Sequence, residues 1–142
     1  MKFSILSILT VIIYLNSYGQ CDTLKIDYQV DHLNRESIKK EIFFTKVPED
    51  SLQINFNDGF DKIPINIKIE GEQKTLNNST NESLGFTGSI RFKRPKSNSQ
   101  IEIYLNDSRA YIEYNAKYNM IHIWRSDCRL TVRHTNRIII YK

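Results

Sequence analysis

The chain has 142 residues, of which 40% are hydrophobic and 25% are charged, and its formal net charge is +4 at pH 7. This length is enough for one domain with a real hydrophobic core. The mild basicity comes without a basic helix or a ribonucleoprotein-type motif, so the composition argues against nucleic acid as a partner.

The N-terminus has the parts of a Sec-type signal peptide. Met1-Lys2 is a short positive region, residues 5–15 are an apolar run, and Ser17-Tyr18-Gly19 offers small residues where a signal peptidase reads the chain. The apolar run is too short for a transmembrane helix, which needs about twenty apolar residues. We therefore expect a signal peptide over residues 1–19, a single domain over residues 20–142, a secreted or periplasmic location and no transmembrane segment after cleavage.

Both cysteines, Cys21 and Cys128, remain after this cleavage. An oxidising compartment and an even number of cysteines favour a disulfide bond between them, and two free thiols are the alternative. Lipidation of Cys21 is disfavoured, because Gln20 and Tyr18 stand where a lipobox has a small residue and a leucine-like residue.

Alternating apolar residues predict several short strands in the first two thirds of the mature chain. Residues 23–31, 52–56, 63–69 and 90–92 alternate in this way. Pro64 has no N–H, so its strand should lie at an edge or begin with an unpaired position. Turn signals separate these segments, and no sustained helical pattern is present, which favours an antiparallel β-sandwich of about eight to ten short strands. Residues 34–44 fit either a helix or a strand, and we favour the strand.

Residues 99–142 predict a five-strand antiparallel meander, because short loops let their alternating residues pair in one consistent register. In this register Leu105 lies opposite Ala110, and Ile121 lies opposite both Ile112 and Val132. The last loop is interpreted as residues 135–137, although a two-residue turn at 135–136 is the alternative. The inward face of the meander would comprise Ile101, Ile103, Leu105, Ala110, Ile112, Ile121, Ile123, Leu130, Val132, Ile138 and Ile140.

The same registers place aromatic and charged residues together on the outward face of the meander. Flat rings with polar edges, beside guanidinium groups and carboxylates, can hydrogen-bond a sugar or the backbone of a partner protein. The plainer interpretation is that these cross-strand pairs only stabilise a solvated sheet, or that another layer covers them. The candidate ligand-binding residues are Tyr104, Tyr111, His122, Trp124, Arg129 and Tyr141.

The sequence does not supply a catalytic or metal-binding constellation. The histidines His32, His122 and His134 lack metal-ligand spacing, and the last two fall on opposite faces of the predicted meander. Glu102 and Glu113 are predicted cross-strand neighbours, but two carboxylates on an open sheet face are a weak sign of glycosidase chemistry. Neither a nucleophile elbow nor a phosphate loop is present. We therefore expect no enzyme activity, no metal and no cofactor.

The leader ending in Ser17-Tyr18-Gly19-Gln20 resembles leaders of Bacteroidota bacteria. The run from Asn57-Asp58 through the alternating isoleucines to the segment 80–86, together with the closing Tyr141, is similar to small secreted β-sandwich proteins of those bacteria. The resemblance implies export and a β-sandwich fold, and it assigns no functional residue.

These observations lead to three function hypotheses. The first is a non-catalytic exported binding module, with carbohydrate as the ligand of the outward aromatic face. The second is a module that binds another envelope or extracellular protein, as an inhibitor or immunity-type protein does, for which the loop 94–98 would matter more. An enzyme or a metal carrier is the third.

Overall fold

The computed structural model describes residues 21–29, 47–60, 62–77, 85–106 and 108–136. These ranges contain nine strands, and none of their segments forms a helix long and apolar enough to span a membrane. The strands are β1 (Lys25–Gln29), β2 (Ser51–Phe56), β3 (Ile65–Ile69), β4 (Glu72–Leu76), β5 (Gly88–Lys93), β6 (Ser99–Leu105), β7 (Ser108–Tyr114), β8 (Met120–Ser126) and β9 (Arg129–Thr135).

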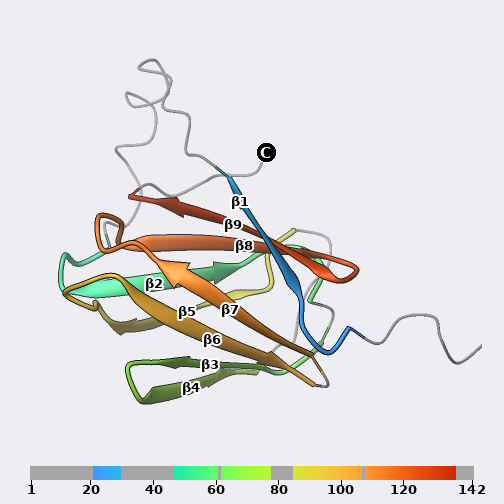
Figure 1. Cartoon of the computed structure of the whole chain (residues 1–142). Helices are drawn as coiled ribbons and strands as arrows, with labels where there is room; N and C mark the ends of the chain where they lie inside the picture. Colours follow the sequence, from blue (N-terminus) through green and yellow to red (C-terminus); the bar gives the residue numbers. More distant parts are fainter. Residues whose placement is uncertain (1–20, 30–46, 61, 78–84, 107, 137–142) are drawn as a thin grey trace, which may run out of the picture.

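The strands form two sheets that face each other (Figure 1). One sheet has five strands in the order β1-β9-β8-β2-β5, and the other has four in the order β4-β3-β6-β7. The pairs β1–β9 and β2–β8 are parallel, and the remaining pairs are antiparallel. The predicted all-β sandwich is confirmed, although the five-stranded sheet is mixed rather than wholly antiparallel.

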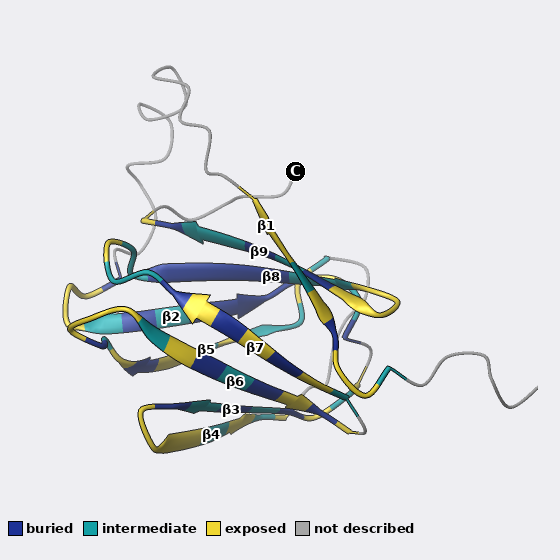
Figure 2. Ribbon diagram, viewed as in Figure 1, coloured by how far each residue is buried: buried dark blue, intermediate teal, exposed yellow. Residues whose placement is uncertain are grey.

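The hydrophobic core lies between the sheets, and buried residues alternate with exposed ones along most strands (Figure 2). Phe56 and Phe60 meet edge to face in this core, with ring centroids 5.2 Å apart. The predicted inward residues that the structure describes are all buried: Ile101, Ile103, Leu105, Ala110, Ile112, Ile121, Ile123, Leu130 and Val132. Ile138 and Ile140 lie outside the described residues.

The predicted meander is wrong, because the chain changes sheets between β7 and β8. Ile112 pairs with Ile101 in the four-stranded sheet, and Ile121 pairs with His134 in the five-stranded sheet. In a sandwich the inward faces of both sheets meet the same core, so the change of sheet leaves the buried residues buried. It sends the outward faces of the two hairpins to opposite sides of the molecule.

The registers of both hairpins differ from the prediction by two residues. Leu105 pairs with Ser108, so the first loop has two residues rather than the four predicted at 106–109. Ser126 pairs with Arg129, so the second loop is 127–128 rather than the predicted 126–127. Asn106 and Asp127 take positive φ angles in these turns, which Asn and Asp tolerate better than most residues. A shift of two residues preserves the face of every side chain, so alternation alone does not detect it.

The connection 115–119 that carries the chain between the sheets is held by side chains from other loops. The guanidinium of Arg94 donates to the carbonyl of Ala116 at 2.7 Å, and the Ala116 N–H donates to Asn98 Oδ1 at 2.9 Å. Within the connection, the Tyr118 N–H donates to the Asn115 carbonyl at 3.1 Å. These bonds fix the end of β7 relative to the start of β6.

Two features of the four-stranded sheet bear on the earlier predictions. β3 begins directly after Pro64 and lies between β4 and β6, which confirms that the proline precedes the paired positions. β4 was not predicted, because its residues are mostly exposed and show no clear alternation of apolar side chains. Residues 34–44 and the predicted signal peptide over residues 1–19 lie outside the described residues.

The predicted disulfide between Cys21 and Cys128 is confirmed, with their Cα atoms 5.5 Å apart. This bond ties the segment before β1 to the turn between β8 and β9. That segment also runs beside β7, because the Arg109 N–H donates to the Asp22 carbonyl at 3.0 Å and the Leu24 N–H donates to the Arg109 carbonyl at 2.9 Å. The chain then continues as β1, which pairs with β9, so it passes from the edge of one sheet to the other (Figure 1).

Candidate functional site

The change of sheet divides the aromatic face predicted from the sequence. Tyr104 and Tyr111 lie on the outward face of β6 and β7, where each is 37% exposed. His122, Trp124 and Arg129 belong to β8 and β9 in the other sheet. Tyr141 lies outside the described residues. The predicted residues therefore do not form one surface, and the expectation of a single continuous face is wrong.

The part of this face on β8 and β9 is engaged in contacts within the protein. His122 is only 3% exposed and stacks on Trp124, with ring centroids 5.9 Å apart. The guanidinium of Arg133 lies 5.6 Å from the centroid of the Trp124 ring, within cation–π range. Arg129 forms an ion pair with Asp27 at 2.6 Å. A ligand would have to displace these contacts to use the same side chains.

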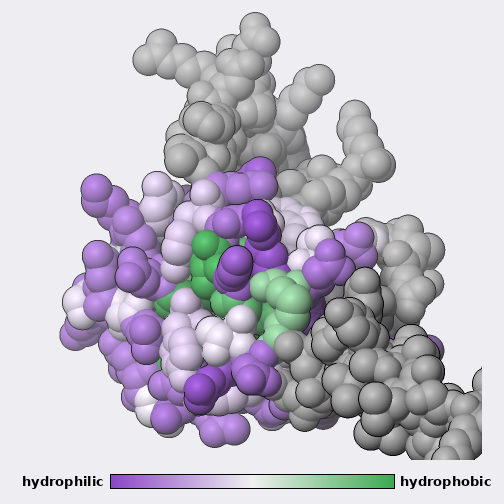
Figure 3. Space-filling model, turned by 45° about the vertical axis from the view of Figure 1, so that its right-hand side comes forward, coloured by the Kyte–Doolittle hydropathy of each residue, from purple (hydrophilic) through white to green (hydrophobic). Residues whose placement is uncertain are grey.

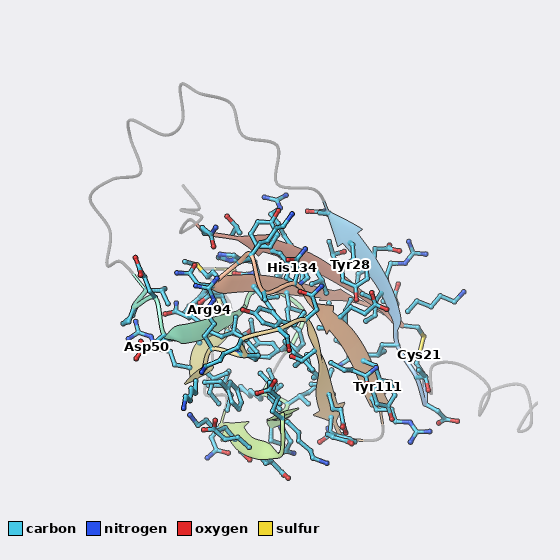
Figure 4. The ribbon with its side chains drawn as sticks, turned by 60° about the vertical axis from the view of Figure 1, so that its left-hand side comes forward. Cys21, Tyr28, Asp50, Arg94, Tyr111 and His134 are labelled. Carbon is cyan, nitrogen blue, oxygen red and sulfur yellow. A yellow bond between two sulfur atoms is a disulfide. The ribbon has the colours of Figure 1, made fainter. Side chains whose placement is uncertain are left out.

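A groove of about 530 Å³ opens where β1 diverges from β7, near the end of the β6–β7 hairpin. Figure 4 shows Tyr28 and His134 side by side at this end of the molecule, with Tyr111 further back along β7. The volume falls within the range usual for small-molecule sites. The groove is lined by Tyr28, Asn98, Ser99, Gln100, Glu113, Tyr114, Asn115 and His134.

His134 stands at the centre of a cluster of tyrosine rings. Its ring centroid lies 6.0 Å from that of Tyr28, 6.4 Å from that of Tyr114 and 5.9 Å from that of Tyr118. Burial lowers the pKa of His134 below its ordinary value, and a hydrogen bond with the backbone of Glu113 partly offsets this shift. The imidazole is therefore neutral at pH 7 and gives the groove no positive charge.

Tyr28 joins the two sheets at the mouth of the groove. Its side chain leaves β1 on the core side but stays 48% exposed, because β1 has already moved away from the edge of β7. The Glu113 N–H of β7 donates to the Tyr28 hydroxyl at 2.8 Å. One ring thus forms the wall of the groove and also occupies a backbone donor on the exposed edge of β7.

The polar part of the lining combines amide groups with one carboxylate. Asn98 Oδ1 accepts from Ala116, and Asn115 Oδ1 accepts from the Lys117 N–H at 3.0 Å, which fixes the orientation of both amides. Gln100 and Glu113 are cross-strand partners with exposed side chains. Glu113 is the only acidic or basic side chain other than His134 among the described lining residues.

Two polar atoms in the walls of the groove lack a hydrogen-bond partner among the described residues. They are Ser99 Oγ and His134 Nε2, and both are buried. A buried polar atom without a partner costs about 1–3 kcal/mol.

A second, smaller hollow of about 330 Å³ lies beside the loop 93–96. The guanidinium of Arg94 extends across it to the carbonyls of Ala116 and Glu49, and the Arg94 N–H donates to the Asp50 carbonyl at 2.7 Å. Figure 4 places Arg94 and Asp50 together, away from the Tyr28–His134 groove. Arg94 thus holds three loops together, which makes this hollow a structural joint.

The described residues do not place three or more His, Cys, Asp or Glu side chains where they could hold a metal ion. His122 and His134 face opposite sides of the five-stranded sheet, in agreement with the prediction. Glu102 pairs with Tyr111 and Glu113 pairs with Gln100, so the predicted pairing of the two glutamates is wrong. The two-residue shift of the hairpin separates these carboxylates along the strands.

Sequence reasoning missed the groove because its residues come from distant segments, and some of them from inward positions. Tyr28 and Tyr114 occupy strand positions that alternation assigns to the core. A tyrosine at the end of an inward row is the one available signal, since its hydroxyl needs a polar partner when the ring is buried. Tyr114 meets this need by donating to the Tyr118 carbonyl at 2.7 Å.

Comparison of the chain with protein-family models, with curated proteins and with solved structures finds no match.

Proposed function

We propose that this protein is an exported, non-catalytic binding module, and that it holds a segment of a neutral glycan in the Tyr28–His134 groove. The observation that carries the proposal is the composition of this one groove. The exposed ring of Tyr28 stands in its wall, and fixed side-chain amides and a single carboxylate lie around it. Aromatic rings can stack on the C–H face of a sugar, while amides and carboxylates hydrogen-bond its hydroxyl groups.

The charges of the lining support a neutral, hydroxyl-rich ligand. Phosphate and sulfate groups are usually bound by Arg or Lys, and neither occurs among the described lining residues. The neutral state of His134 removes the remaining source of positive charge. The face drawn in Figure 3 is mostly hydrophilic among its coloured residues, with one small hydrophobic area.

The same lining supports binding without catalysis. Glycoside hydrolysis ordinarily needs two carboxyl groups, about 5–10 Å apart, on either side of the scissile bond. The described part of the groove contributes one, Glu113. The protein would therefore hold a glycan without cleaving it.

The location outside the cytoplasm rests on two observations. The Cys21–Cys128 disulfide suits an oxidising compartment. The first 19 residues have the composition of a signal peptide. A glycan ligand is consistent with such a location, because polysaccharides are abundant on and around cells.

The proposal can be tested by isothermal titration calorimetry with cello-, xylo-, manno- and chito-hexasaccharides. Gln100→Ala and Glu113→Gln are suitable variants, because these exposed side chains have no part in the packing of the core. We expect saturable binding of one series, and a loss of affinity of about fivefold in each variant, since one hydrogen bond to ligand contributes on the order of 1 kcal/mol. Gln73→Ala, an exposed glutamine on β4, is the matched control and should bind as the wild type does.

Two results would overturn the proposal. One is the absence of binding to all four series; stoichiometric recovery of one protein partner on the immobilised chain would then favour the protein-binding hypothesis. The other is saturable binding that neither Gln100→Ala nor Glu113→Gln weakens, which would place the glycan elsewhere.

A further inference from the structure

The groove continues into an exposed aromatic surface on the outward face of β6 and β7. Gln100 and Glu113 line the groove and pair across these strands. The next outward pair along the hairpin is Glu102 with Tyr111, and the one after it is Tyr104 with Arg109. Outward residues of a strand recur about every 7 Å, so this surface extends about 14 Å beyond the groove.

Building on the proposed function, we infer that the ligand is an extended oligosaccharide, which runs from the groove along this surface and stacks on Tyr111 and Tyr104. A single sugar ring is too short to reach from the groove to both tyrosines. Their rings are among the few large hydrophobic side chains of the described residues that remain exposed. Their position in line with the groove gives a linear chain a continuous path.

The polar neighbours of Tyr104 restrain its ring. The Tyr104 hydroxyl donates to Glu102 Oε2, and this hydrogen bond raises the pKa of Tyr104. Lys68 Nζ lies 3.9 Å from Glu102 Oε1, on the neighbouring strand β3. A preorganised ring loses less conformational freedom on binding than a mobile one, which favours affinity.

The edge of β7 is less suited to a peptide ligand. A peptide that adds to a sheet needs a row of unpaired backbone groups on the edge strand. On β7 the N–H and C=O of Arg109 already bond to Asp22 and Leu24, and the Glu113 N–H bonds to the Tyr28 hydroxyl. Recognition by side chains on the strand face is therefore favoured over recognition by the strand edge.

If the ligand follows this path, its affinity depends on the length of the oligosaccharide. Calorimetry with a disaccharide and a hexasaccharide of the same series tests this dependence. The hexasaccharide should bind the wild type at least about tenfold more tightly than the disaccharide. Tyr111→Ala should abolish this gain and leave disaccharide affinity unchanged, because the disaccharide occupies the groove alone. Tyr111→Phe should keep most of the gain, since it retains the ring. Phe86→Ala removes an exposed ring outside β6 and β7 and should change nothing.

The outcomes separate this inference from the proposed function. Equal affinity for both lengths, unchanged in Tyr111→Ala, would overturn the extended path but leave the groove as the glycan site. Loss of hexasaccharide binding in Tyr111→Ala, without any effect of Gln100→Ala or Glu113→Gln, would also overturn the extended path, because the oligosaccharide would then bypass the groove. Failure of both lengths to bind in every series would overturn both proposals.

Discussion

The ring of Tyr28 stacks on the imidazole of His134, with centroids 6.0 Å apart and an interplanar angle of 20°. This contact joins the edge strand β1 to the end of β9, and the Tyr28 hydroxyl extends it to the Glu113 N–H of β7. The pair therefore links both sheets at the groove. A change in either residue should alter both the stability of this end of the sandwich and its ligand binding.

Substitutions of Tyr28 separate the two roles of its side chain. Tyr28→Phe keeps the ring and removes the acceptor for the Glu113 N–H, which water can replace at this exposed edge. We expect it to lower the free energy of unfolding by about 1 kcal/mol or less. Tyr28→Ala also removes the ring contact and should cost clearly more, while weakening glycan binding. Urea unfolding measures both, and equal losses in the two variants would show that the ring contact contributes nothing.

Acidification should destabilise the protein through His134. Because burial lowers the pKa of His134 in the folded state, the unfolded chain binds its proton at a higher pH than the folded chain does. The contribution to stability is complete above about pH 6.5, the ordinary pKa of histidine, and is lost as the pH falls through the lower pKa of the folded state. The groups facing the imidazole are the tyrosines of its ring cluster and the backbone of Glu113.

The measurement is the urea midpoint at pH 7.5 and at pH 5.5. The midpoint of the wild type should fall between these values by more than that of His134→Gln, which cannot take up a proton. A fall of the same size in both proteins would assign the acid sensitivity to other groups.

The disulfide should make a large contribution to stability. Cys21 and Cys128 are 107 positions apart, and closing a loop of that size stabilises the folded state by about 4–5 kcal/mol in the chain-entropy model. The double variant Cys21→Ser, Cys128→Ser should lose most of this amount in guanidinium unfolding. A reducing agent should destabilise the wild type but leave the double variant unchanged. A double variant as stable as the oxidised wild type would contradict the prediction.

Gly59 and Gly71 provide a matched pair of backbone substitutions. Both have positive φ angles, 92° and 87°, so alanine is strained at either position. At Gly59 an added Cβ would also lie 2.0 Å from the carbonyl oxygen of Arg125, whereas nothing lies within 4 Å of one at Gly71. Gly71→Ala should cost about 1 kcal/mol, and Gly59→Ala at least about 3 kcal/mol, because backbone must move. Thermal unfolding ranks the two, and similar losses would show that the Gly59 turn relaxes easily.

The sequence predicts which residues of β6–β9 are buried, but it does not predict how these strands pair. Ile103 and Ile121 alternate with polar residues, and period-two alternation assigns each to the core whichever sheet contains it. Whether β8 pairs with β7 or crosses to the opposite sheet depends on the loop 115–119. That loop is fixed by Arg94 and Asn98, which lie far away in the sequence.

The candidate site also depends on strand pairing that the alternation of residues does not predict. Tyr111 and His122 share an outward position in the alternation, but they lie in different sheets. The groove, by contrast, depends on the divergence of β1 from β7, which brings Tyr28 beside His134. The parallel pairing of β1 with β9 joins residues 104 positions apart, such as Gln29 and Arg133, and no local pattern specifies it.

The ring signals of the histidines report whether a glycan enters the groove. The chain has only three histidines, so their NMR signals can be followed separately during a titration with the hexasaccharide that binds by calorimetry. The account predicts that the ring signals of His134 shift in proportion to saturation, while those of His122, on the other face of the sheet, stay in place. Saturation that leaves the His134 signals unmoved would contradict it.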